Sequence, residues 1–560
     1  MSARCCTHAG LGQRVVVVAV ALWCGAGLAL ARETWRKVST PEVTVVTTLG
    51  AKEATAWATE FVQYIAALRN FLGDRRAPLP TLTIVVFAQE RDFQRYLPLS
   101  GPGGSPLPVG GFFVRHESWA VVGMPARVSE ETRRTIFHEG VHWFLSTSDT
   151  RNPVWLEEGL AEVFSTFHAD REMAEWGRAI EGHVRLLRSA SLLPLEQLLR
   201  TAQRELFGND RMRTSLVYAE AWAFVHYLMF GQHDIPPRAM AGYLEALSSG
   251  MPPDEAFRKV FGRTYAEMDQ QLRTYLADGQ YHLARLPLAG AVKSGVQQAT
   301  TVEVENALGR LAITGRRTAQ AMAHAGAAMA AAPDDPRGHE LFALALKASG
   351  DAAAALAKFE EAIARGSKEF QPYFEVAQAA HRATLDRQRP LLPAEARAIA
   401  DQYERALGFY PRHLASYENL AGVIGLAEPT REDDRKSLEL GHRLYPESAV
   451  IELGLAQLDH RSGNAVAARA TVERVLASRQ GMPGDGVEFA RRLKVAWEQE
   501  EVMLLSQQVK TALDERQWVA ARRALGRLLE SSAPLAMKSE ARRTLAALDE
   551  RRLGLEPGQP

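Results

Sequence analysis

The sequence contains very little cysteine. Its 560 residues include three, Cys5, Cys6 and Cys24, and all of them lie near the N-terminus. The chain from Gly25 onward therefore offers neither a disulfide nor a thiolate ligand. Any metal site in that part must be built from histidine and carboxylate side chains.

The chain also lacks an excess of charge of either sign. Its 66 basic and 66 acidic residues cancel, so no overall field favours a nucleic acid as partner, and none is expected. Hydrophobic residues make up 46% and charged residues 24%, which is typical of an ordinary globular protein. The length is too great for a single core, so two or three domains are expected.

Long apolar runs are absent apart from one at the N-terminus. Arg4 and Arg14 precede the run VVVVAVALWCGAGLALA, which ends in Ala29-Leu30-Ala31. A basic start, a short apolar stretch and small residues at the end are typical of a cleaved secretory signal, here residues 1–31. We expect the mature chain to be extracytoplasmic, in the periplasm, without a membrane span. An uncleaved membrane anchor is the alternative.

Strand and helix patterns alternate in the first half of the chain. The β-branched runs VTVVTT (43–48) and LTIVVF (82–87) predict strands, and FFV and WAVVG (119–123) predict two short ones. A helix is expected over about 130–146, and further helices over about 152–282. Residues 32–285 are therefore predicted to form an α+β domain, with a small mixed sheet and a helical subdomain.

The second half has no strand signal and shows a repeated phrase. Tyr410-Pro411 recurs as Tyr445-Pro446, and helix-breaking turns recur at Gly350-Asp351 and Gly463-Asn464. Residues 299–484 resemble three or four tetratricopeptide repeats (TPRs), an all-α solenoid, after a linker at 286–298 and before C-terminal helices at 485–560. Solenoids commonly bind partners, so a protein partner on the repeats is expected, with plain scaffolding as the alternative.

The stretch RTIFHEGVHWFL (134–145) contains the candidate metal-binding and catalytic residues. His138 and His142 are one helical turn apart, so both imidazoles project from one face and can share an ion. Zinc (Zn²⁺) suits this pair because imidazole is one of its preferred ligands. Glu139 is rotated away from the pair and is placed to act as general base on a water molecule. The alternative is a pair of hydrogen-bonded core histidines.

A catalytic zinc needs a third protein ligand and one open position. The stretch NPVWLEEGLAEVFS (152–165) supplies carboxylates: Glu158 and Glu162 are one turn apart on the next predicted helix. The alternative for these glutamates is a solvated acidic helix face. Together, HEGVHWFL and PVWLEEGLAEVFS resemble the gluzincin metallopeptidases, in particular the peptidase MA-like domains that precede TPRs in bacterial secreted proteins.

The resemblance implies specific roles and a thermolysin-like fold. Glu158, directly before Gly159, would be the third zinc ligand, and Glu162 would hydrogen-bond a ligand histidine. Tyr218, in VYAEAWAFVHYLMFG, would match a catalytic tyrosine of aminopeptidase N-like enzymes, with packing at a helix start as the alternative. The strand WAVVGM (119–124) would be the sheet edge that binds an extended substrate, with an interior strand as the equal alternative. No counterpart of the loop that grips a free amino terminus is found, which favours an endopeptidase.

The leading hypothesis is thus a secreted zinc metallopeptidase acting on a peptide or protein substrate, with repeats that recruit substrate or partner. One alternative is a catalytically idle metal-binding domain in a repeat-based assembly factor of the cell envelope. Another is the group of periplasmic quality-control peptidases with HExxH and repeats, in which the third ligand comes much later in the chain.

Overall fold

The computed structural model describes residues 34–554 apart from 73–78, 102, 147–151, 171, 207–209, 232–233, 237, 288–294, 387–389 and 479–483. The predicted signal segment 1–31 and most of the predicted linker lie outside these residues. None of the helices among the described residues is long and apolar enough to cross a membrane.

The first half of the described chain is built on a six-stranded mixed sheet with the order β4-β5-β3-β2-β1-β9. Its centre is parallel, because β3 pairs with β2 on one side and with β5 on the other in parallel. The outer pairs β1–β2, β1–β9 and β4–β5 are antiparallel. The strands are β1 (Arg36–Ser39), β2 (Val43–Thr47), β3 (Thr81–Phe87), β4 (Phe112–Arg115), β5 (Trp119–Pro125) and β9 (Gln297–Gln298).

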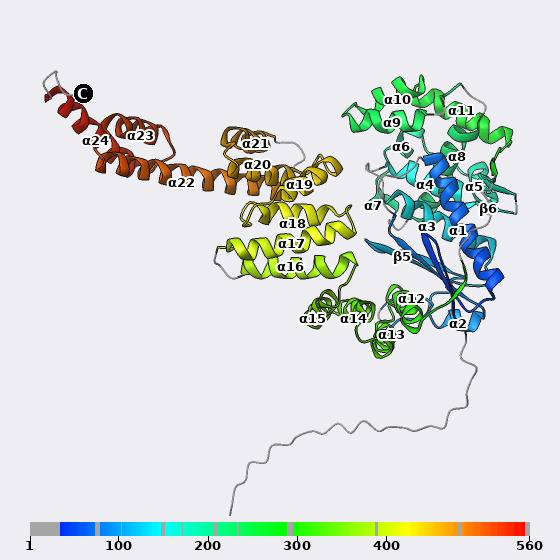
Figure 1. Ribbon diagram of the computed structural model, residues 1–560. Coiled ribbons are helices and arrows are strands. Elements are labelled where there is room, and N and C mark those ends of the chain that lie inside the picture. The colour runs from blue at the N-terminus through cyan, green and yellow to red at the C-terminus, as the bar shows by residue number, and fades with distance from the viewer. Residues whose placement is uncertain are drawn as a thin grey trace, which may run out of the picture. The chain divides into compact units, whose positions relative to one another are not determined.

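Alternate residues of the central strands enter two different cores, as the period of a strand requires. Ile84 and Val122 pack with the residues of α1 (Ala51–Leu72) and α3 (Glu130–Leu145). Val85 and Val121 pack instead with α12 (Thr301–Thr314), the first helix of the second half. Figure 1 shows α3 above the sheet and α12 below it. Helices therefore cover both faces.

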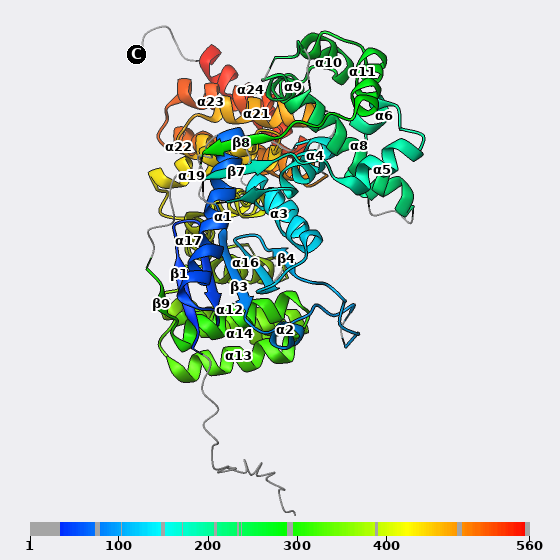
Figure 2. The ribbon, with the colours of Figure 1, turned by 90° about the vertical axis from the view of Figure 1, so that its right-hand side faces the viewer.

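A helical subdomain follows α3. It contains α4 (Val154–Ser165), the long buried α8 (Arg211–Phe230), which Gly231 ends, and the shorter helices around them. Only helices were expected over 152–282, but the structure adds a three-stranded sheet in the order β6-β7-β8, in which β7 and β8 lie side by side (Figure 2). The strands are too short to give a clear alternation in the sequence. The remaining elements are α2 (Glu90–Gln94), β6 (His168–Ala169), β7 (Met173–Trp176), α5 (Glu181–Ser189), α6 (Leu195–Leu199), α7 (Gln203–Leu206), α9 (Ala239–Ser248), α10 (Pro253–Phe261), α11 (Tyr265–Asp278) and β8 (Ala284–Pro287).

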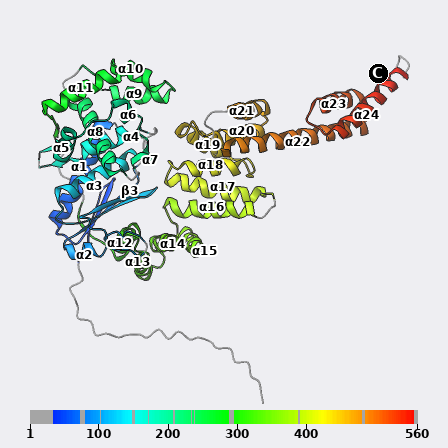
Figure 3. The same ribbon diagram turned by 180° about the vertical axis from the view of Figure 1, so that it is seen from behind.

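The second half is all-helical and TPR-like, as the repeated phrase predicted. Gly350 and Gly463 end their helices at φ 90° and 89°, a left-handed conformation that only glycine adopts without strain. Five helix pairs occur among the described residues, more than the three or four units expected, and Figure 3 shows α16, α17 and α18 stacked in succession. The pairs are α12 with α13 (Thr318–Ala331), α14 (Pro336–Ser349) with α15 (Ala352–Ala364), α16 (Phe370–Asp386) with α17 (Pro393–Phe409), α18 (Leu414–Ile424) with α19 (Glu432–Leu444), and α20 (Ala449–Arg461) with α21 (Ala465–Ala477).

Three more helices continue the array. The first half of α22 (Gly484–Asp514) packs Leu493 and Trp497 on α20 and α21. Its second half packs Leu505 against α23 (Trp518–Glu530) and α24 (Leu535–Gly554). The long helix thus joins two small cores.

Candidate metal centre

Helix α3 carries the two histidines. Ser129 caps its N-terminus by accepting a hydrogen bond from the Thr132 amide, and two glutamates in the first turn complement the helix dipole. The helix packs one face into the sheet core through buried residues that include Phe137 and Val141. His138 and His142 are half-buried on another face, which is turned toward α4.

Helix α4 brings the carboxylates, and Gly159 sets how closely it approaches α8. A Cβ at Gly159 would stand 2.4 Å from Val225 Cγ2 and 2.5 Å from the Ala221 carbonyl oxygen. Glycine is therefore required where the two helices touch. Glu158 and Glu162 of α4 are 4% and 9% exposed, which excludes the alternative of a solvated acidic face. The neighbouring Glu157 lies elsewhere, accepting a hydrogen bond from Asn152.

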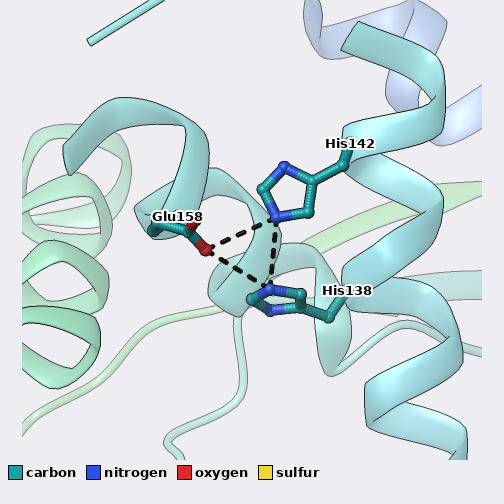
Figure 4. A group of neighbouring side chains, drawn as sticks. All are labelled: His138, His142 and Glu158. Atoms are coloured by element: carbon teal, nitrogen blue, oxygen red, sulfur yellow. Dashed lines mark hydrogen bonds and ion pairs between the residues drawn. The ribbon is translucent and has the colours of Figure 1, made fainter. Parts of the chain in front are cut away.

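Three ligand atoms converge between the two helices (Figure 4). The Nε2 atoms of His138 and His142 are 3.3 Å apart, and each lies 3.4 Å from Oε2 of Glu158. Ligands about 2.1 Å from a tetrahedral zinc ion are about 3.4 Å from one another, so the triangle has the size that zinc requires. The buried Glu158 Oε2 also has no hydrogen-bond partner. The residues present fit a metal ion.

The electrostatics of the three groups favour a bound cation. Burial works to raise the pKa of Glu158, but the facing imidazoles of His138 and His142 outweigh it and lower the pKa to about 2. Burial works to lower the pKa of His138, but Glu158 and Glu162 outweigh it and raise the pKa to about 10. Without a metal, His138 is therefore protonated at neutral pH, and a metal must displace that proton.

Glu162 stands behind the ligands. Its Oε1 lies 3.3 Å from Nδ1 of His138, the ring nitrogen that faces away from the ligand triangle. Its Oε2 lies 3.1 Å from Nε2 of His183 and 3.3 Å from Nη2 of Arg134. Burial tends to raise the pKa of this carboxyl, but contacts with His138 and His183 hold it well below its usual range. Glu162 is therefore an anion directed at a ligand histidine.

Glu139 and Tyr218 flank the same centre. The Tyr218 ring on α8 has its centroid 6.0 Å from that of His138. Burial, followed by the charges of Glu158 and Glu139, raises the pKa of Tyr218 well above its usual range. The hydroxyl therefore keeps its proton and can donate a hydrogen bond. Glu139 is half-buried. Burial, followed by the charge of Glu139, raises the pKa of Tyr64.

The sequence reasoning missed two residues, and of the two alternatives for WAVVGM the structure shows the interior strand. It did not single out Arg134 or His183, although Arg134 stands one turn before His138 on the same helix. The edge next to α3 is β4, because β5 (Trp119–Pro125) lies between β4 and β3. Arg115 at the end of β4 donates a hydrogen bond to the carbonyl of His142, with a distance of 2.8 Å. Finally, His226 of α8 is fully buried and contacts Tyr275 and Gly177.

Comparisons with known proteins concern two parts of the chain. Residues 132–253 match the family described as "Protein of unknown function (DUF1570)". This stretch contains His138, His142, Glu158 and Tyr218. No curated protein matches the sequence.

Several similar solved structures are described as TPR proteins. They include YrrB, described as a TPR protein with an unusual peptide-binding site (10% identity, 34% of this chain and 90% of that one, TM-score 0.26). Others are PilF of Pseudomonas aeruginosa (16%, 41% and 91%, TM-score 0.22) and a TPR protein from Parabacteroides merdae (9%, 56% and 97%, TM-score 0.21). The chain thus combines a stretch that matches DUF1570 with TPR-like helical repeats, and a group of two histidines and a glutamate that fits a metal ion lies in the former.

Proposed function

We propose that this chain is a zinc-dependent metallopeptidase of the gluzincin type, acting on peptide bonds. The observation that carries the proposal is the ligand triangle of His138, His142 and Glu158, with sides of 3.3–3.4 Å. Two further groups suited to acyl chemistry, Glu139 and Tyr218, stand beside it. A structural zinc site would use four protein ligands, whereas three leave a position open for chemistry.

Each residue has a role in hydrolysis. When bound, zinc supplies a Lewis acid that polarises a carbonyl and lowers the pKa of water. Glu139 takes a proton from the attacking water molecule while the oxygen of that water forms a bond to the carbonyl carbon. Glu139 then gives that proton to the amide nitrogen as the carbon–nitrogen bond breaks. Tyr218, kept protonated by burial and nearby carboxylates, donates a hydrogen bond to the oxygen that becomes negative.

The free edge of β4 is the proposed place for an extended substrate. An edge strand offers unpaired amide and carbonyl groups to a peptide backbone. The hydrogen bond from Arg115 to the His142 carbonyl ties this edge to the end of the metal-binding helix. Substrate held on β4 would therefore lie next to the ligand triangle.

The repeats are proposed to recruit a protein substrate or partner, because stacked helix pairs offer an extended binding surface. The mature chain is proposed to act outside the cytoplasm, in the periplasm. The basis for this is the signal-like N-terminal sequence.

The test combines metal analysis with peptide hydrolysis. We expect about one zinc per chain, lost in His138→Ala. Glu139→Gln is expected to keep the zinc and lose cleavage of a peptide library, while Glu131→Gln, on the exposed first turn of α3, keeps both. A wild-type chain without zinc, or a fully active Glu139→Gln, would contradict the proposal. Zinc without cleavage would favour an idle metal-binding domain in an assembly factor.

A further inference from the structure

The two oxygens of Glu162 face different groups. Oε1 is directed at His138, while Oε2 is shared between His183 and Arg134 at 3.1 and 3.3 Å. The three partners come from two helices: His138 and Arg134 from α3, and His183 from α5. Glu162 therefore joins the metal-binding helix to an element outside the HExxH…E pattern.

The groups around Glu162 help to balance the charge of two buried carboxylates. Glu158 and Glu162 are both buried, and each approaches His138 within 3.4 Å. Because His142 also faces Glu158, the carboxylate that lacks a second cationic partner in this group is Glu162, and an unbalanced buried charge is costly. Arg134 donates a hydrogen bond to Oε2 of Glu162, and Nε2 of His183 lies within ion-pair distance of the same oxygen. With Oε2 held, Oε1 stays aimed at the Nδ1 atom of His138.

Both donors are held in place by further contacts. Nε of Arg134 lies 3.4 Å from the hydroxyl of Ser165, at the end of α4. The ring of His183 lies against the fully buried Trp222, with centroids 5.9 Å apart. Trp222 is one turn beyond Tyr218 on α8. The position of α5 is therefore coupled through α8 to the surroundings of the metal centre.

We propose that His183 and Arg134 are positioning residues for the metal ligand His138, acting through Glu162. They fix the carboxylate so that Nδ1 of His138 carries the hydrogen and Nε2 is left with its lone pair toward the metal. The inference rests on the proposed zinc site but needs no peptidase activity. Loss of groups that orient a ligand typically weakens metal affinity about 10–100-fold.

The test measures zinc affinity by competition with a chelator and the visible absorption of the cobalt-substituted protein. We expect His183→Ala and Arg134→Gln each to weaken zinc binding about 10-fold, and to alter the cobalt spectrum. His183→Gln, which restores a donor, is expected to recover most of the affinity. Two matched controls are available. Arg133→Gln changes the adjacent arginine, which pairs with Glu60, and His226→Gln changes a buried histidine that contacts Tyr275 and Gly177.

A double-mutant cycle tests the route of the effect. If His183 acts through Glu162, adding His183→Ala to Glu162→Gln should weaken zinc binding little further. Unchanged affinity and spectrum in a folded His183→Ala would overturn the inference, as would full additivity in the cycle. These outcomes differ from failure of the proposed function, in which the wild-type chain itself binds no zinc.

Discussion

The carbonyl oxygen of Ala221 lies 2.5 Å from the point where a Cβ of Gly159 would stand. This contact joins α8 to α4 at the residue that follows the ligand Glu158. The backbone of α8 cannot move aside as a flexible side chain could. The two helices can approach this closely because Gly159 has no side chain. The position of Glu158 depends on that close approach.

Gly159→Ala is therefore expected to disturb both fold and site. Overpacking at a tight contact costs about 1–3 kcal/mol of unfolding free energy, and displacement of Glu158 should weaken zinc binding. Denaturant unfolding and chelator competition measure the two effects. Gly326→Ala on α13 is the control, because its Cβ would meet nothing within 4 Å, and it should be neutral or slightly stabilising. Wild-type zinc affinity in Gly159→Ala would contradict the expectation.

The metal-free protein should lose stability as the pH rises above neutrality. Burial opposes the charged form of His138, but Glu158 and Glu162 raise its pKa from 6.5 to about 10. The stabilisation is thus fully present below pH 6.5 and is lost as the pH rises through about 10. Denaturant unfolding of the metal-free chain between pH 6 and 10 measures it. His138→Asn should reduce the pH dependence of the unfolding free energy. An equally steep pH dependence in that variant would show that other groups cause it.

Zinc uptake should release a proton. At pH 7.5 the metal-free His138 is protonated, since its pKa is about 10, and a zinc ligand must be neutral. Apparent zinc affinity is therefore expected to increase with pH. Calorimetric titrations in buffers of different ionisation enthalpy count the protons released, about one per zinc from this residue. Glu162→Gln removes a charge that raises the pKa of His138 and keeps all three proposed ligands, so fewer protons should be released in that variant.

Tyr218→Phe should separate binding from turnover. Loss of one oxyanion donor costs about 10²–10³ in kcat, whereas zinc content should stay at the wild-type level because the hydroxyl is outside the ligand triangle. Tyr227→Phe on the same helix is the control, since its hydroxyl contacts Gln271. Full activity in Tyr218→Phe would remove the tyrosine from the mechanism and leave it a packing role.

Truncation of a repeat side chain should destabilise the sheet domain. Leu311 of α12 is fully buried against β5, and a Cβ at Gly123 would stand 2.6 Å from its Cδ1 atom. Leu311→Ala should cost about 2–5 kcal/mol. By the same argument, a fragment of residues 32–285 should be less stable than one of residues 32–349. Equal melting temperatures for the two fragments would contradict this reasoning.

The proximity of His138 and His142 could be predicted from the sequence because both residues lie within one helix. The spacing of His138 and His142 alone places both rings on one face. The role of Glu158 required a resemblance to known enzymes, since its distance from the histidines depends on how α4 packs. His183 could not be predicted from the sequence, because no motif surrounds it. Its contact with Glu162 depends on where α5 packs in the folded domain.

The sheet architecture was predictable only in part. Apolar runs such as 82–87 indicated buried strands, but their pattern does not indicate which strands pair with one another. Leu311 looks like any apolar residue of a repeat helix, and its place under Gly123 follows from tertiary packing. The short strands β6 to β9 carry too few residues for a period to be visible.

The pairing of β1 with β9 has a consequence for the order of folding. Arg36 and Lys37 lie beside Gln298 and Gln297, so the first strand of the sheet and the last are separated by most of the domain's length. A ribosome must deliver nearly three hundred residues before this edge can close, and contacts so distant in sequence form slowly. Until α12 emerges, one apolar face of the sheet stays open to water. We therefore expect the nascent chain to depend on chaperones until β9 and α12 have been synthesised.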